Sequence, residues 1–140
     1  MRPLVIALAT LAVGGAAATG VAAAQTAPSA DELTGKLQRA LNTSLSADER
    51  ASELEGGSAA VATADNIAAV MDRYGSMMSW RVQNATQNGD QVDAQLAVTV
   101  PLFGTRTHQI YWVNRDGAWK LSNPSACVIA RDAAGAACTV

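Results

Sequence analysis

The spacing of apolar residues changes near Gly75, and this change restricts the fold more than any other feature of the sequence. Before Gly75, apolar residues recur every three or four positions, which is typical of helices that bury one face. After Gly75 they alternate with polar residues, as in strands that bury one side. This order predicts an α+β domain in which N-terminal helices pack on a curved four-stranded antiparallel sheet.

Two capping-box patterns predict where the first two helices begin. Ser29 and Glu32 stand three residues apart, as do Ser46 and Glu49, so each pair can exchange hydrogen bonds between side chain and backbone. The first helix is expected to bury one face, because leucines recur at every fourth position along it: Leu33, Leu37 and Leu41. The second helix is expected to be short and to end at the glycine pair 56–57.

A third helix is predicted immediately before Gly75. Thr63 is expected to be its N-cap, and Gly75 is expected to end it in the left-handed conformation. Between these two residues, apolar side chains keep the helical spacing: Ile67, Val70, Met71 and Tyr74. We expect the helix that carries Met71 and Tyr74 to cover the apolar face of the sheet.

The turn around Asn88 sets the expected pairing of the first two strands. A three-residue loop, Gln87–Gly89, pairs Trp80 with Leu96 and keeps the apolar side chains together. A two-residue loop at 88–89 is the alternative, and it places Trp80 among polar residues of the next strand. We therefore expect the three-residue loop.

Two further turns fix the rest of the sheet. A three-residue loop at 103–105 pairs Val98 with Ile110, and a two-residue loop at 116–117 pairs Trp112 with Leu121. One face of the sheet then collects the large apolar side chains: Trp80, Val82, Leu96, Val98, Val100, Ile110, Trp112, Trp119 and Leu121, with His108 at the edge.

The first 24 residues have the features of an export signal. Arg2 precedes an apolar run over residues 4–13, and small residues lead to the cleavage pattern Ala22–Ala24. A retained transmembrane anchor is the alternative, but the run is shorter than the roughly 20 apolar residues that cross a bilayer. We expect a secreted protein that is cleaved after Ala24, with no stable membrane anchor and one α+β domain at residues 25–140.

Cys127 and Cys138 are the two cysteines of the chain. In an oxidising compartment two cysteines of one domain usually pair, so a disulfide is expected to hold the C-terminal end. A catalytic or redox thiol is the alternative, but the sequence contains no C-x-x-C pattern.

Charge and motif content argue against several classes of function. With 10 Lys and Arg against 12 Asp and Glu, the net charge is −2, which does not fit nucleic-acid binding. One histidine and two cysteines are too few for a structural zinc site, and we expect no metal and no cofactor. No phosphate loop, Rossmann glycine pattern or nucleophile elbow is present, so we expect no enzyme and no catalytic residue. A hydrolase or isomerase that uses His108 is the weakest alternative.

Large side chains of the third helix and the sheet are candidates for a ligand pocket. Five of these side chains would line the space under the helix: Met71, Tyr74, Trp80, Trp112 and Trp119. His108 would be a polar group at the mouth of this space. The competing interpretation is that the same residues fill the space as a core, which we expect for so few large side chains. Candidate partners are a small apolar ligand or a component of the cell envelope.

Three segments carry a resemblance to a known family: PSADELTGKLQRAL, ELEGG and IYWVNRDGAWKLSNPSAC. They resemble the mycobacterial low-molecular-weight secreted antigen family, whose closing strand–turn–strand motif is matched by Val113-Asn114, Gly117, Trp119, Leu121-Ser122 and Ser125. The resemblance implies a secreted, antigen-like actinobacterial protein with no assigned catalytic residues. Helices followed by a curved sheet also look like the cystatin-like or NTF2-like cone folds, an analogy of fold that carries no function.

Overall fold

The computed structural model describes residues 26–140, so the predicted leader, residues 1–24, lies outside the described part. Helices occupy both ends of this part and strands the middle, with η2 and η3 as 3₁₀ turns and η4 as a π-helical turn. The elements in chain order are α2 (Ala30–Leu41), α3 (Ala47–Ala51), η2 (Gly57–Ala60), α4 (Val61–Tyr74), η3 (Gly75–Met77), β1 (Ser79–Asn88), β2 (Gln91–Val100), β3 (Gly104–Arg115), β4 (Ala118–Leu121), α5 (Asn123–Val128) and η4 (Ile129–Ala133).

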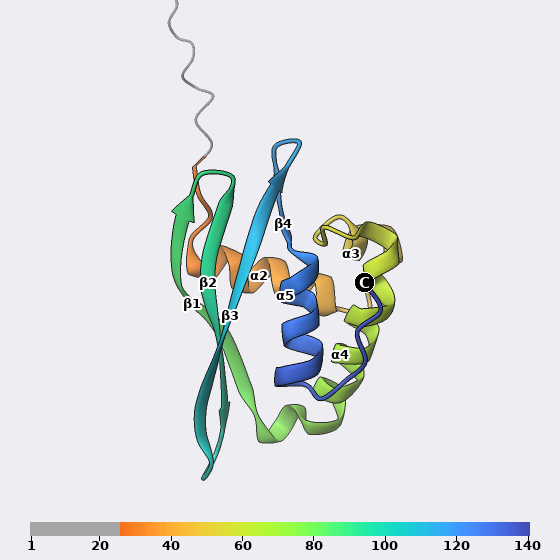
Figure 1. Cartoon of the computed structure of the whole chain (residues 1–140). Coiled ribbons are helices and arrows are strands. Elements are labelled where there is room, and N and C mark those ends of the chain that lie inside the picture. The colour runs from red at the N-terminus through yellow and green to blue at the C-terminus, as the bar shows by residue number, and fades with distance from the viewer. Residues whose placement is uncertain (1–25) are drawn as a thin grey trace, which may run out of the picture.

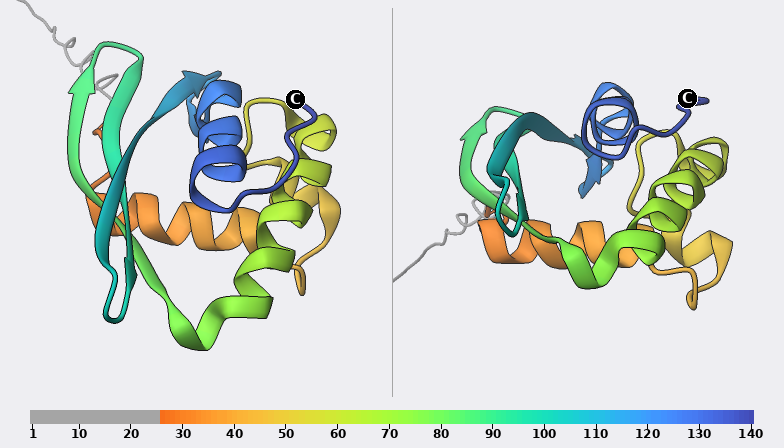
Figure 2. Two further views of the ribbon diagram at one scale, coloured as in Figure 1. Left: turned by 60° about the horizontal axis from the view of Figure 1, so that its bottom comes forward. Right: turned by 90° about the horizontal axis from the view of Figure 1, so that it is seen from below.

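The four strands form one antiparallel sheet in the order β1-β2-β3-β4 (Figure 1). The sheet is strongly twisted, and the helices lie on one side of it (Figure 2). The predicted α+β class is therefore confirmed. The likeness to cystatin-like or NTF2-like cones stays a prediction.

The N-terminal helix α2 packs on the sheet, as the α+β prediction expected, but the main cover of the sheet is not the helix that was predicted to provide it. α2 packs against β1, while α5 and η4 pack against β3. α4, the helix expected to cover the sheet, packs mainly against α2, η2 and η4, and its residues Ile67 and Met71 meet the sheet around the pocket beside Trp80.

Both predicted capping boxes are present. Glu32 N–H donates to Ser29 Oγ at 3.1 Å, and Ser29 N–H donates to Glu32 Oε1 at 3.2 Å. The pair Ser46 and Glu49 makes the same two bonds, each at 3.1 Å. These bonds satisfy backbone donors that a helix start otherwise leaves unpaired.

The third helix ends before Gly75, as predicted, but its predicted start and the predicted conformation of Gly75 are wrong. α4 begins at Val61, because the η2 turn runs directly into it without a side-chain cap. Thr63 is instead buried in the helix, where its hydroxyl accepts the N–H of Thr139 at 2.9 Å. Gly75 has a right-handed φ of −58° and continues into η3, so it is not a left-handed cap.

The first hairpin has a different register from the predicted one. Asn88 pairs with Gln91 across a two-residue turn at 89–90, and Trp80 pairs with Val98 rather than with Leu96. The ladder is interrupted between Gln83 and Thr86 by a bulge. The extra residue in the bulge allows the tighter turn and still keeps Trp80 on the apolar face.

The second hairpin is longer than predicted, and the third turn agrees with the prediction. β3 already begins at Gly104, so Val98 pairs with Arg106 rather than with Ile110. The predicted register is off by four residues, an even number, so the predicted face of the sheet is unchanged. Trp112 pairs with Leu121, as expected from the two-residue turn at 116–117.

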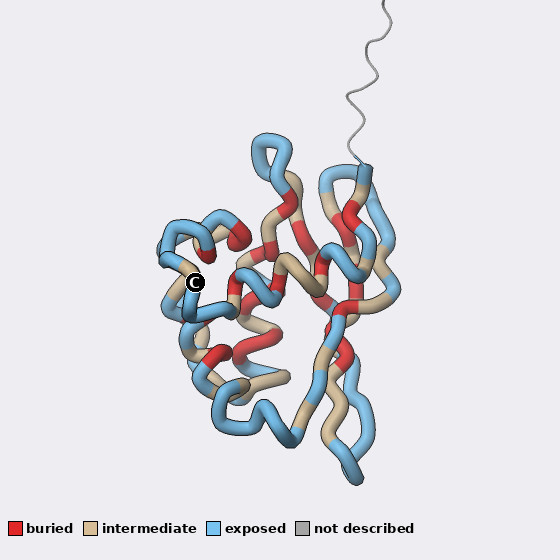
Figure 3. Tube along the Cα trace, turned by 180° about the vertical axis from the view of Figure 1, so that it is seen from behind, coloured by how far each residue is buried: buried red, intermediate tan, exposed pale blue. Residues whose placement is uncertain are grey.

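One hydrophobic core joins the sheet and the helices. It includes Leu33 from α2, Ile67 from α4, Trp112 from β3 and Ile129 from η4. Buried residues follow the middles of the strands and the inner sides of the helices, whereas the ends of all three hairpins are exposed (Figure 3).

Candidate functional site

The structure places the six residues of the predicted ligand pocket in different surroundings. Trp112 and Trp119 are packed into the core, with 0% and 8% of their surface exposed. Tyr74 is largely exposed at 47%, and His108 borders a separate groove. Met71 and Trp80 are the two that share a pocket.

This apolar pocket lies between α2, α4, η4 and the sheet. Its volume is about 30 Å³, and its walls are almost entirely carbon: Leu37, Leu41, Ile67, Val70, Met71, Met78, Trp80, Leu96, Val98, Ile129, Ala133 and Ala134. A cavity that admits one benzene molecule measures about 150 Å³, and pockets for small ligands usually measure ~300 Å³ or more. As it stands, the pocket accommodates a few water molecules at most.

A larger, open groove of about 320 Å³ lies beside His108. Val98 and Val100 lie at one side of it, and Phe103, Arg106 and Asp132 also border it. Within residues 26–140, the half-buried ring of His108 makes no hydrogen bond or ion pair. A histidine that acts as a general base needs a nucleophile or an orienting group within hydrogen-bond reach.

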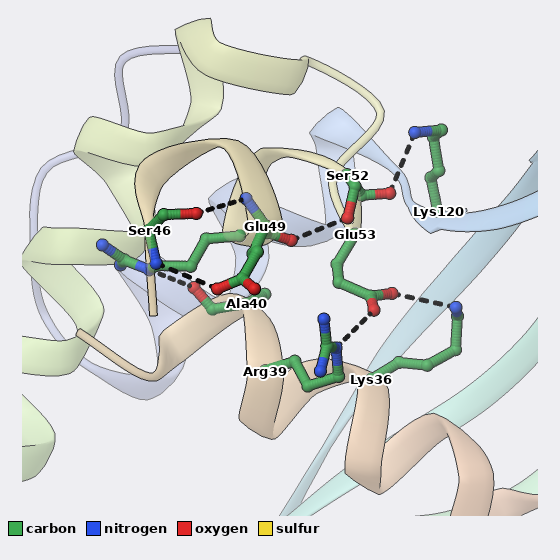
Figure 4. A network of polar contacts seen from close by, with 9 residues as sticks. Lys36, Arg39, Ala40, Ser46, Glu49, Ser52, Glu53 and Lys120 are labelled. Carbon is green, nitrogen blue, oxygen red and sulfur yellow. Dashed lines mark hydrogen bonds and ion pairs between the residues drawn. The ribbon is translucent and has the colours of Figure 1, made fainter. Parts of the chain in front are cut away.

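Glu53 is held by two cations in a network that joins α2, the α3 region and β4 (Figure 4). Its two carboxylate oxygens lie 2.8 Å from Lys36 Nζ and 3.0 Å from Arg39 Nε. Nearby, Lys120 Nζ donates to the carbonyl of Ser52 at 2.9 Å. This carboxylate therefore ties the segment after α3 to α2, while Lys120 and the backbone bond from Leu121 N–H to the Glu53 carbonyl, at 2.9 Å, tie the same segment to β4.

Arg50 and Glu55 have similar structural contacts. The buried Arg50 donates from Nε to the carbonyl of Ala40 at 3.0 Å and forms an ion pair with Asp65 at 2.7 Å. Glu55 accepts the N–H of Asn123 at 2.9 Å and forms an ion pair with Arg115. Between residues 26 and 140, no three His, Cys, Asp or Glu side chains are grouped so that they could hold a metal ion.

Cys127 and Cys138 form the predicted disulfide. It connects α5 to the C-terminal tail, which also bonds to α4. Asn66 Nδ2 donates to the carbonyl of Ala137 at 3.1 Å, next to the bond between Thr63 and Thr139 described above. The disulfide and these two bonds fix the tail against the helices.

The serines of the closing motif build the corner between β4 and α5. Ser122 caps α5 by accepting the N–H of Ser125 at 3.2 Å, and it donates to Ser125 Oγ at 2.7 Å. Ser125 Oγ in turn accepts the N–H of Tyr111 at 2.7 Å. Both serines are buried, as are the motif residues Trp119 and Leu121, so this motif specifies packing.

The end of the β2–β3 hairpin is a surface feature that the sequence analysis missed. Leu102 and Phe103 are 102% and 85% exposed there, in a three-residue turn between Val100 and Gly104. Two large apolar residues between a proline and a glycine were the available signal, because turns usually carry polar residues.

Fold and site together define an α+β domain with a largely aliphatic core, which encloses Trp112 and Trp119, and with a disulfide-fixed tail. A model of the C-terminal domain of the low molecular weight antigen MTB12 matches residues 26–138 of the chain. The chain therefore belongs to the MTB12 C-terminal domain family, as the resemblance indicated. No individually curated protein matches it in sequence. Among the helices of residues 26–140, none has the length and apolar character required to cross a bilayer.

Proposed function

We propose that this protein is an exported, non-enzymatic module that acts by surface contact with a partner. The observation that carries the proposal is the filled space on the helical side of the sheet. Trp112 is fully buried, and the pocket beside Trp80 measures about 30 Å³. An interior packed to this degree leaves no internal cavity of ligand size, which supports a role carried by the surface.

Export is supported by two independent features. The leader-like residues 1–24 end in a cleavage pattern after Ala24. The disulfide between Cys127 and Cys138 fits a protein that folds outside the reducing cytosol. The name of the family, a low molecular weight antigen, fits a protein that is exposed outside the cell.

The absence of an enzymatic role is the second part of the proposal. The groove beside His108 offers a histidine without a bonded partner in the described chain, and Glu53 and Glu55 are engaged in structural ion pairs. These arrangements support a role in which side chains hold the fold and do not transfer protons or groups.

A small apolar ligand carrier is the second candidate function, and the wholly apolar lining of the pocket between Met71 and Trp80 favours it. A carrier would require the side chains around the pocket to move apart when a ligand enters. Trp80 lines the pocket, so its fluorescence would report such an event.

A titration followed by tryptophan emission separates the two candidates. Residues 26–140 are titrated with a long-chain fatty acid, a sterol and benzene. We expect no saturable change, because the pocket is smaller than any of these ligands. The variant Met71→Ala serves as a control, since it enlarges the same pocket next to Trp80 and is expected to admit benzene. Saturable binding of any of the three compounds to the unaltered protein would refute the surface-contact proposal in favour of the carrier.

A further inference from the structure

Large apolar side chains are exposed at one end of the molecule. Besides Leu102 and Phe103, Met77 is 61% exposed and Tyr74 is 47% exposed. The β2–β3 turn carries the first two, and the η3 turn with the end of α4 carries the others. Both turns lie at the lower end of the molecule, and the views from other sides agree (Figures 1 and 2). Four exposed apolar residues at one end indicate a contact surface.

The fold gains nothing from having Leu102 and Phe103 in this turn. Both side chains are almost fully exposed, so they contribute no packing to the core. Leu102 also has a φ of +75°, and Phe103 N–H donates to the carbonyl of Val100 at 2.9 Å. Leu102 therefore occupies the third position of the turn, which favours glycine because an L side chain is strained there. A residue that is both strained and exposed is consistent with a role in binding.

The charges at this end are those of a surface that attracts anions. The outer half of the hairpin, residues 96–108, contains Arg106 and no carboxylate. Arg81 lies on the neighbouring strand β1, beside Ala97. Both arginines are exposed, and neither takes part in an ion pair within the described chain. The arginines near this end, Arg73, Arg81, Arg106 and Arg131, outnumber the carboxylates of Asp72 and Asp132, although Asp132 borders the same groove as Arg106.

We propose that this end of the protein docks on an anionic phospholipid surface, with Leu102 and Phe103 inserted among the lipids. This proposal rests on the proposed surface-contact function and names its partner. Aliphatic and aromatic side chains enter the interfacial region of a bilayer, and tyrosine is favoured at the level of the headgroups. Arginines above the inserted residues bind the anionic headgroups.

A lipid surface fits the geometry better than a second protein does. The apolar residues occupy two separate turns, and a polar pair, Thr99 and Thr105, lies directly behind the hairpin end with their hydroxyls 2.7 Å apart. A bilayer can receive two separate protrusions at once because it is fluid. A specific protein interface needs a continuous, closely packed area around its apolar centre.

Vesicle co-sedimentation tests the proposal. Disulfide-bonded residues 26–140 are mixed with vesicles of phosphatidylcholine alone or of phosphatidylcholine and phosphatidylglycerol in equal parts. We expect binding to the anionic vesicles that weakens as salt is added. The double variant Leu102→Gly/Phe103→Ser is expected to bind the anionic vesicles at least about tenfold more weakly than the unaltered protein. Arg106→Gln is expected to bind them about fivefold more weakly.

Stability measurements and a matched control accompany the vesicle assay. The double variant should melt at a temperature no lower than the unaltered protein, because glycine relieves the strain at position 102. Val140→Ser removes an exposed apolar residue at the C-terminus, away from the hairpin end, and should bind vesicles normally (Figure 1).

Three outcomes would overturn the lipid proposal. The first is no binding of the unaltered protein to anionic vesicles, and the second is full binding by the double variant. The third is a dimer in sedimentation analysis that depends on Leu102 and Phe103, without vesicle binding, since the occupant would then be a second copy. None of these results bears on the ligand titration, so the lipid proposal and the surface-contact proposal can fail separately.

Discussion

Replacing Trp112 with alanine is expected to lower the free energy of unfolding by about 3–5 kcal/mol. Trp112 is the largest fully buried side chain, and it lies on β3 opposite Val92 and Leu121. Its removal loses the transfer free energy of an indole ring and leaves a cavity that the surrounding strands and helices cannot close. Urea unfolding of residues 26–140, followed by far-ultraviolet circular dichroism, measures the change.

Trp80→Ala provides the matched control for this experiment. Trp80 is half-buried on the edge strand β1, so its removal should cost clearly less, about 1–2 kcal/mol. Trp112→Ala could cost more free energy than the domain has, and the variant would then not fold. In that case the milder variant Trp112→Phe is compared with Trp80→Ala. An equal or smaller loss at Trp112 than at Trp80 would show that the core is not centred on β3.

Removing the disulfide with Cys127→Ser/Cys138→Ser is expected to lower the free energy of unfolding by about 2–3 kcal/mol. The two cysteines are 11 positions apart, and a cross-link over a loop of this size restricts the unfolded chain by that amount. The tail should also leave α4, because its bond from Thr139 to Thr63 is no longer held in place.

Reduction of the unaltered protein is the control for the disulfide variant. Unfolding in the presence of dithiothreitol should give the same loss as the double serine variant, because both break one covalent link without changing the core. An unchanged stability in both experiments would mean that the tail contributes nothing to the fold.

The features that were predicted correctly are those fixed by neighbouring residues. The capping boxes at Ser29 and Ser46 need only a partner three residues away, and both are present. The turn at 116–117 fixes the pairing of Trp112 with Leu121 in the same local way. The apolar face of the sheet was also predictable, because side-chain alternation survives any shift by an even number of residues.

Register and helix packing depended on contacts that the sequence does not reveal. The bulge after Gln83 changes the pairing of β1, and nothing in the alternation of apolar residues marks it. The main covering helix was predicted wrongly for a related reason. Both α2 and α4 have an apolar face, and only the folded structure shows that α2 makes the closer contact with the strands.

The candidate site was predictable in part. The sequence identified the tryptophans as core residues, and Trp112 and Trp119 are buried. It could not show how far apart Met71, Tyr74 and His108 lie, since that depends on the order of the layers. The exposed pair at Leu102 and Phe103 was missed because the strands around it were expected to be shorter, with Phe103 starting a loop.

An NMR titration with anionic bicelles tests the account most directly. In this account the core is closed, and the contact surface lies at the end of the β2–β3 hairpin. Residues 26–140 are labelled with ¹⁵N, and both backbone amide and indole signals are followed. We predict shifts confined to the hairpin residues 101–106 and the turn 74–77, with the indole signals of Trp112 and Trp119 unmoved. Shifts of these two buried indoles, with the hairpin end unaffected, would mean that lipid enters the core and would contradict the account.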